Sequence, residues 1–168
     1  LKKKKIKVLK TREPGGSQTA ESIRKLIFGR FSKSFDKLTD YFLMLAARNE
    51  HLNKTLIKAK VEKKIVVCDR FIDSTNAYQV KGNKINSQMN KINHKYILKG
   101  IRPNLTIILK SNLKTTKKRI KQRKRNNKFD MLKGNFYNKV QKAFEEIASK
   151  NKKDYIVFNS SNNDNYLE

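Results

Sequence analysis

Two short apolar runs, set among stretches with helical periodicity, constrain this chain most strongly. One run is Ile65-Val66-Val67-Cys68, and the other extends from Leu105 to Leu109 after Arg102-Pro103. Runs of this length without a strict polar alternation fit strands that are buried on both faces of a parallel sheet. Strands that alternate with helices then indicate an α/β fold with a parallel sheet.

Capping signals and residue spacing place the other elements. Ser17 is a candidate N-cap and Gly29 a candidate stop for one helix. Apolar residues from Leu38 to Ala59 recur at helical spacing and predict one long helix. We therefore expect strands at residues 6–9, 65–68, 105–109 and 155–158, and helices at 17–28, 37–62, 74–81, 86–99, 113–124 and 134–150.

The formal net charge is +27 over 168 residues. Taken alone, this charge suggests a polyanionic partner such as nucleic acid. Most of the excess is lysine, spread along the whole chain among Asn and Ile residues, which is typical of drift in an AT-rich genome. We therefore expect no specific nucleic-acid partner, although a basic surface would attract a small anionic substrate.

The chain carries one cysteine, Cys68, which cannot form an internal disulfide and fits a reducing compartment. Its apolar runs are too short to cross a bilayer, and the basic start is not followed by an apolar stretch. The length suits a single domain. We expect a cytoplasmic protein without a membrane partner. His51 and His94 lack neighbours at ligand spacing, so they predict no metal site.

Charged residues follow the predicted strands: Thr11-Arg12-Glu13 after the first, Asp69-Arg70 after the second and Lys110 after the third. Ligands of parallel α/β sheets bind at these carboxyl ends. Arg can bind a phosphate through two parallel hydrogen bonds, and Asp at a strand end can hold magnesium through water. A plain surface salt bridge between Asp69 and Arg70 is the alternative.

Four stretches occur in a recognisable order. They are "TREPGGSQTAESIRKL" from Thr11, "LMLAARNEHL" from Leu43, "DRFIDSTNAYQ" from Asp69 and "RPNLTIILK" from Arg102. Together they resemble the signature elements of the thymidylate kinase family, over about residues 6–150. The resemblance implies transfer of the γ-phosphoryl group of ATP to dTMP, giving dTDP and ADP, with Mg²⁺ as cofactor. Such catalysis is mainly positioning and charge neutralisation.

The resemblance also implies a fold and an assembly. The family has a three-layer α/β/α P-loop kinase fold, with a parallel sheet of order 2-3-1-4-5, and is usually a homodimer. A lid is expected at about residues 123–134, within "RIKQRKRNNKFD" from Arg119. Arg123 and Arg125 are the candidates there for neutralising charge on the transferred group.

Site roles carry over position by position. Arg12 and Arg70 would bind the acceptor phosphate. Glu13 and Asp69 would lie near the magnesium and the reacting phosphates, Asp69 through water and Glu13 as a possible ligand. Gly15 and Gly16 would let the chain turn closely against the ligand.

The rest of the acceptor pocket follows in the same way. Arg48 would reach a thymine carbonyl, and Gln79 would bond the polar edge of the base. Tyr78 would pack near the deoxyribose, and Arg24 would line the pocket. Two further contacts depart from the usual family residue: Met44 stands where a stacking Phe is usual, and Thr75 where Ser or Asn is common.

The 168 residues contain no Gly-x-x-x-x-Gly-Lys-Ser/Thr loop, which in this family cradles the ATP phosphates. Residues 1–5 resemble the end of the helix that should follow that loop. We therefore expect a chain truncated by roughly 25 residues at its amino terminus, judged from element lengths, and lacking the central strand 1. We also expect a closing helix to be missing at the other end. Such a chain alone would not catalyse phosphoryl transfer.

Two other functions stay open at this point. A related nucleoside or nucleotide kinase with another acceptor would share the fold. A non-enzymatic polyanion-binding protein would account for the charge and for the missing loop.

Overall fold

The computed structural model describes residues 6–30, 32, 34–122 and 134–161. The chain divides into two compact units, Leu1–Ile101 and Arg102–Glu168. Each unit contains helices and parallel strands, as the alternation of apolar runs and helical stretches predicts.

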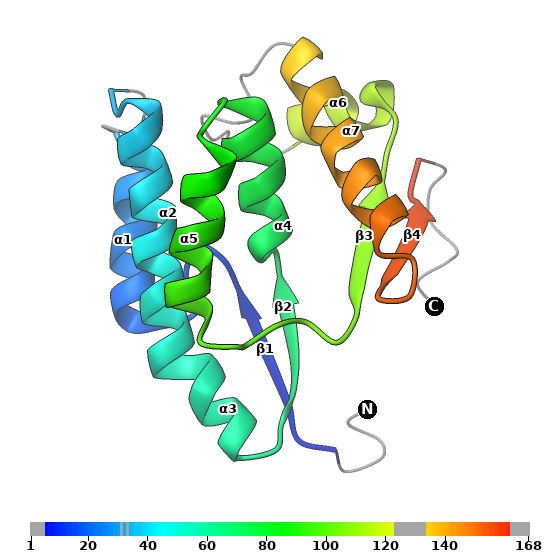
Figure 1. Cartoon of the computed structure of the whole chain (residues 1–168). Helices are drawn as coiled ribbons and strands as arrows, with labels where there is room; N and C mark the ends of the chain where they lie inside the picture. The colour runs from blue at the N-terminus through cyan, green and yellow to red at the C-terminus, as the bar shows by residue number, and fades with distance from the viewer. Residues whose placement is uncertain (1–5, 31, 33, 123–133, 162–168) are drawn as a thin grey trace. The chain divides into compact units, whose positions relative to one another are not determined.

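The first unit is built on two parallel strands, β1 (Val8–Arg12) and β2 (Ile65–Asp69), which lie side by side in Figure 1. Their register runs from Val8 opposite Ile65 to Arg12 opposite Asp69. The helical segments of this unit are α1 (Gln18–Phe28), α2 (Lys37–His51), η2 (Leu52–Leu56), α3 (Ile57–Val61), α4 (Ile72–Thr75), η3 (Asn76–Gly82) and α5 (Ser87–Leu98).

Side-chain caps fix the starts of the long helices. The Ser17 hydroxyl accepts a hydrogen bond from the Ala20 amide at 3.2 Å, and Gly29 ends the same helix, which confirms both predictions. Asp36 accepts hydrogen bonds from the amides of Leu38 and Thr39 at the start of α2. These caps satisfy amide groups that the first turn of a helix leaves unpaired.

Two segments, η2 and η3, have the wider π-helical hydrogen bonding. The η2 segment joins α2 to α3 without a break. The helix predicted over residues 37–62 is therefore present as one continuous run, in which the hydrogen bonding changes from α to π over Leu52–Leu56. The η3 segment continues α4, and the two together include the helix predicted over residues 74–81. Such π turns inside helices frequently occur at functional sites.

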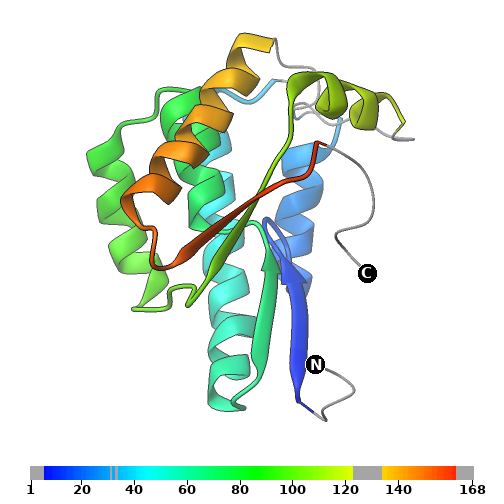
Figure 2. The ribbon, with the colours of Figure 1, turned by 90° about the vertical axis from the view of Figure 1, so that its right-hand side faces the viewer.

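The second unit pairs β3 (Thr106–Lys110) with β4 (Tyr155–Asn159), again in parallel (Figure 2). Its helices are α6 (Leu113–Lys121) and α7 (Gly134–Lys150). The predicted helix over 134–150 is confirmed. The helix predicted over 113–124 begins at Leu113 as expected but ends earlier, at Lys121, with Gln122 as its C-cap. Within the described residues, the strands form two two-stranded sheets, β1–β2 and β3–β4.

Two strand predictions were wrong in detail. The first strand begins at Val8 rather than Ile6 and continues through Arg12, so Thr11 and Arg12 belong to it. The apolar runs are also not buried on both faces: Val67 is 51% exposed and Ile107 55% exposed, while their neighbours in the strand are partly covered. Burial on both faces requires a cover on each face, and within its own unit each strand is covered on one.

The apolar cluster of the first unit lies where helices cover β2. Leu52 and Leu56 of η2 and Leu98 of α5 form its buried centre. The partly buried apolar residues packed against it are Val66, Phe71, Ile72, Ile97 and Ile101. This cluster fixes η2, α5 and the start of α4 on one face of β2. No helix within the described residues is long and apolar enough to cross a membrane.

Candidate functional site

Charged side chains gather at the carboxyl ends of β1 and β2, as the sequence predicts. Arg12 and Asp69 are register partners at the last step of the pairing, and the Glu13 amide donates to the Asp69 carbonyl at 2.9 Å. Asp69 and Arg70 are exposed, whereas Glu13 is 3% exposed. The same strand ends therefore present both a solvent-facing and a buried charged group.

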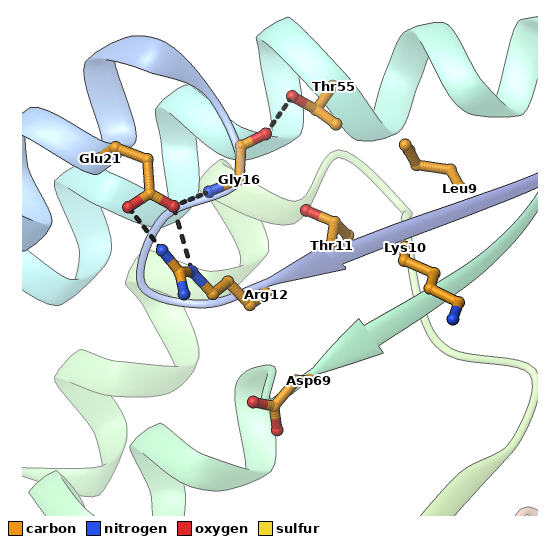
Figure 3. Close-up of a pocket in the computed structure, with 8 residues that line it drawn as sticks. All are labelled: Leu9, Lys10, Thr11, Arg12, Gly16, Glu21, Thr55 and Asp69. Atoms are coloured by element: carbon orange, nitrogen blue, oxygen red, sulfur yellow. Dashed lines mark hydrogen bonds and ion pairs between the residues drawn. The ribbon is translucent and has the colours of Figure 1, made fainter. Parts of the chain in front are cut away.

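Arg12 is held by Glu21 of α1. Its Nε and Nη2 donate to the two carboxylate oxygens at 3.2 and 3.0 Å, and the Gly16 amide donates to Glu21 Oε1 at 3.0 Å (Figure 3). The hydrogen bond from Arg12 is the main reason that the pKa of Glu21 lies below its ordinary value. Glu21 therefore fixes the direction of Arg12 and ties the turn to α1.

The turn itself requires glycine. Gly15 and Gly16 have φ of +131° and +86°. A Cβ on Gly16 would lie 2.4 Å from Thr11 Oγ1 and 2.5 Å from His51 Nε2. The Gly16 carbonyl accepts a hydrogen bond from Thr55 at 2.8 Å (Figure 3). The chain thus passes closely over Thr11 of β1 and His51 of α2.

Beneath this turn, Glu13 joins two residues of α2. Its Oε2 accepts from Arg48 Nε at 2.7 Å, and its Oε1 lies 3.0 Å from His51 Nδ1. Because a carboxylate only accepts hydrogen bonds, His51 Nδ1 carries a proton. His51 Nε2 lies 2.7 Å from Thr11 Oγ1. These contacts form a buried polar network in which each group has a partner.

His94 of α5 extends the network. Its Nε2 lies 2.7 Å from Arg48 Nη1, and the Arg48 guanidinium also lies 5.4 Å from the centre of the Phe71 ring. Burial first, and then the Arg48 charge, lowers the pKa of His94 to about 4. His94 is therefore neutral near pH 7 and accepts the hydrogen bond from Arg48.

Two further arginines lie near Arg12. Arg24 Nη1 donates to the Pro14 carbonyl at 2.7 Å, and its guanidinium stacks over Phe28. Burial lowers the pKa of Arg24, and the charges of Arg12 and Arg70 lower it further. Mutual repulsion among three arginines is relieved when an anion binds between them.

Arg70 follows β2 in a left-handed conformation, with φ of +66°. Its guanidinium carbon lies 5.1 Å from the centre of the Tyr78 ring, which belongs to η3. A positive φ at a residue other than glycine is strained, and such strain clusters at functional sites. This contact links two of the predicted site residues, Arg70 and Tyr78.

Three further predicted residues lie on the helices beside these groups. Thr75 and Gln79 are each only 2% exposed, and Met44 of α2 is partly buried. Among the described residues, the buried side-chain atom that lacks a hydrogen-bond partner is Asn90 Oδ1.

Of the two residues predicted to lie near magnesium, Asp69 is better suited to hold it than Glu13. Asp69 is exposed and makes no ion pair within the described residues, as a water-mediated ligand would require. Both Glu13 oxygens already accept hydrogen bonds in the buried network. The described residues hold no group of three His, Cys, Asp or Glu side chains that could bind a metal by themselves. Arg123 and Arg125, and most of the predicted lid, lie outside the described residues.

An open pocket of about 500 Å³ lies beside the carboxyl end of β1 (Figure 3). Among its lining residues are Arg12, Glu21 and Asp69. Of the predicted site residues, Arg12, Gly16 and Asp69 line it, whereas Arg24, Arg48, Arg70, Tyr78 and Gln79 do not. The pocket therefore covers only a small part of the predicted site.

Sequence reasoning missed three residues of this site: Glu21, His51 and His94. Glu21 and His51 each stand three residues from an assigned arginine on the same helix, Arg24 and Arg48, and this spacing could have placed them on one face. His94 is 46 residues from Arg48, and no local signal joins the two.

The fold and these side chains define an α/β protein with a cluster of arginines and carboxylates at the carboxyl ends of two parallel strands. A sequence model of the family described as thymidylate kinase matches residues 1–167. The chain belongs to the thymidylate kinase family.

Individual relatives agree with this membership. The chain is 39% identical over 143 residues to a thymidylate kinase of Wolbachia pipientis wMel, covering 85% of this chain and 69% of the relative. It is 35% identical over 163 residues to a thymidylate kinase of Mycoplasma capricolum, covering 96% and 76%.

A solved structure is also similar. The crystal structure of thymidylate kinase from Ehrlichia chaffeensis matches with a TM-score of 0.74 and 31% identity, covering 96% of this chain and 74% of that one. The expected α/β P-loop kinase fold is therefore confirmed, and with it the phosphotransferase class of the chain.

Proposed function

We propose that the protein binds dTMP as phosphoryl acceptor and forms dTDP with ATP as the donor. The observation that carries this proposal is the group of three arginines, Arg12, Arg24 and Arg70, at the carboxyl ends of β1 and β2, in a chain of this family. Guanidinium groups carry the opposite charge to a nucleotide phosphate and match the geometry of its oxygens.

The phosphate would bind mainly to Arg70 and Arg24. Arg70 stacks on Tyr78, and Arg24 is anchored at the Pro14 carbonyl, so both guanidinium groups have a defined position before the ligand arrives. Arg12 is hydrogen-bonded to the Glu21 carboxylate. The N–H groups of Arg12 that do not contact Glu21 would donate to the phosphate. Groups that are ordered in advance lose less entropy on binding.

The base would bind in the buried part of the site. Arg48 donates to Glu13 through Nε and to His94 through Nη1, which leaves Nη2 for a carbonyl oxygen. Gln79 would pair with the polar edge of the base, and Met44 would cover a ring face. Such buried pairing strongly rejects a base that lacks the matching group.

Magnesium, when bound, would neutralise charge on the phosphates of the donor. Asp69 would hold it through water, and Arg123 and Arg125 remain the proposed lid residues. The donor loop is outside these assignments, because the 168 residues contain no Gly-x-x-x-x-Gly-Lys-Ser/Thr motif.

The test is a panel of acceptors, dTMP, dUMP, dCMP and AMP, measured with the gene product in full. Titration calorimetry gives each Kd, and coupled ADP release with ATP gives kcat/KM. We expect dTMP to bind most tightly and to react fastest. A clear preference for dUMP, dCMP or AMP would reassign the acceptor and favour the related-kinase alternative.

Binding to a DNA fragment separates the remaining alternative. We expect weak binding that disappears as salt rises, since scattered lysines provide only general electrostatic attraction. Binding that persists at high salt, without any affinity for dTMP, would favour a polyanion-binding protein.

The proposal includes a homodimer and a cytoplasmic location. The first rests on the family resemblance and the second on the lone Cys68. Light scattering on a sizing column checks the first through the molar mass, which should be twice that of one chain.

A further inference from the structure

We propose that His94 is a positioning residue for Arg48, and that this pair sets the preference for a base with a carbonyl over a base with an amino group. The inference rests on the proposed function, because it concerns the base that the acceptor site takes. It adds to that function a residue of α5 that belongs to none of the four signature stretches.

Arg48 is anchored at two points of its planar guanidinium group. Nε is 2.7 Å from Glu13 Oε2, and Nη1 is 2.7 Å from His94 Nε2. Two contacts on one rigid plane fix both its position and its rotation. Within the described residues Nη2 makes no hydrogen bond, so its direction is determined by the two anchors.

His94 can serve as an anchor only in its neutral form. Arg48 has donors and no acceptor, so His94 Nε2 must accept and must be unprotonated. The groups that face His94 agree with this: Arg48 of α2 opposes a second positive charge, and Glu13 beyond it is already paired with Arg48. The contact therefore holds throughout the neutral pH range.

The helix that carries His94 is itself fixed by its neighbours. Asn93 Nδ2 donates to the Tyr41 hydroxyl of α2 at 3.1 Å. Asn90, one turn earlier, donates through Nδ2 to Asn76 of η3 at 2.7 Å. Leu98, one turn later, lies in the apolar cluster. His94 therefore has little freedom to follow Arg48, and it is Arg48 that follows His94.

This anchoring favours selectivity. A fixed N–H of Nη2 meets a carbonyl oxygen favourably but meets an amino group as donor against donor. If the His94 anchor is lost, the guanidinium can rotate about its remaining contact with Glu13. Arg48 would then bind a carbonyl oxygen less well and could turn away from an amino group. The affinities of the site for the two kinds of base would therefore become more alike.

A matched pair of amide variants tests this. His94→Gln places an amide oxygen near the former Nε2 position, whereas His94→Asn carries the same amide on a stem shorter by one methylene and falls short of Arg48. His94→Leu fills the volume without an acceptor and serves as a third variant. Titration calorimetry on the full chain gives the Kd of dTMP and of dCMP for each, and urea unfolding confirms that each variant folds.

We expect His94→Gln to keep the dTMP affinity and the dCMP/dTMP ratio of Kd values within about threefold of the wild type. His94→Asn should weaken dTMP binding about tenfold and lower that ratio by a similar factor, since a hydrogen bond to a charged group is lost. In steady state the change should appear in KM for dTMP, with kcat little changed.

Two results would overturn the inference. One is a folded His94→Asn or His94→Leu variant that keeps the wild-type ratio; the other is a His94→Gln variant that loses it as the other two do. Absence of dTMP binding by the wild type would overturn the proposed function instead, and this inference with it, so the two failures are distinguishable.

Discussion

Glu13 and Arg48 form a buried ion pair: Oε2 and Nε are 2.7 Å apart, and the two side chains are 3% and 4% exposed. Glu13→Gln would leave the Arg48 charge without its counter-charge. We expect a loss of about 3–5 kcal/mol in the free energy of unfolding, measured by urea denaturation.

Glu21→Gln is the matched control for that change, because Glu21 also accepts from an arginine but the pair is largely exposed. Its cost should be at most about 1 kcal/mol. Equal losses in the free energy of unfolding for Glu13→Gln and Glu21→Gln would mean that burial of the Glu13–Arg48 pair does not increase the cost of breaking it.

Gly16→Ala should be severely destabilising. The new methyl carbon would meet Thr11 and His51 at about 2.5 Å or less, in a backbone conformation with φ of +86°. Gly100→Ala provides the control, since Gly100 has φ of +77° and nothing within 4 Å of a Cβ. Backbone strain alone should cost about 1–2 kcal/mol there, and steric overlap should add about 1–3 kcal/mol at Gly16. Thermal unfolding of both variants measures the difference.

Stability should fall on mild acidification because of His94. Its pKa is about 4 in the folded protein, against an ordinary value of 6.5. As the pH drops through this window, the unfolded chain takes up a proton that the folded chain does not, so the free energy of unfolding decreases by about 3 kcal/mol. Urea midpoints from pH 7 to 4 measure this loss.

His94→Gln lacks that titration and should show a shallower dependence on pH. Groups such as Glu21, whose pKa is lowered, are common to both proteins and cancel in the comparison. Parallel curves for the wild type and the variant would argue against a neutral, buried His94.

Gln79→Leu should separate binding from stability. The Gln79 amide has no hydrogen-bond partner within the described residues, so its replacement by an apolar group of similar size should change the free energy of unfolding by less than about 1 kcal/mol. The affinity for dTMP should fall at least about tenfold, as calorimetry would measure. A large loss of stability without a change in affinity would assign Gln79 to the core.

Local signals determined what could be predicted. Ser17 and Gly29 mark the ends of α1 through their own backbone preferences, and the periodicity from Leu38 to Ala59 predicts the long helix directly. The exposed faces of β2 and β3 were missed because an apolar run does not reveal how many layers cover it.

The same difference between local and long-range signals determines which parts of the site could be predicted. The strand-end charges Arg12 and Asp69 follow from the position of ligands in parallel sheets, and the structure brings them together. The contact of Arg48 with His94 joins residues from two helices, and the acceptor role of the histidine depends on burial. No spacing rule in one sequence contains that information.

In the helical run formed by α2, η2 and α3, residues before η2 contribute to the site, whereas residues within η2 contribute to the apolar core. Arg48 and His51 precede η2 and face Glu13, whereas Leu52 and Leu56 within it reach the apolar cluster. A π turn holds one more residue than an α turn, because each amide pairs with the carbonyl five residues back and not four. Deleting one residue from η2 would therefore leave a regular helix in which α3 keeps nearly the same angular position relative to α2, and Ala59 would stay buried. In this stretch, therefore, the wider turn absorbs one residue of length and preserves the angular phase between the site and the core.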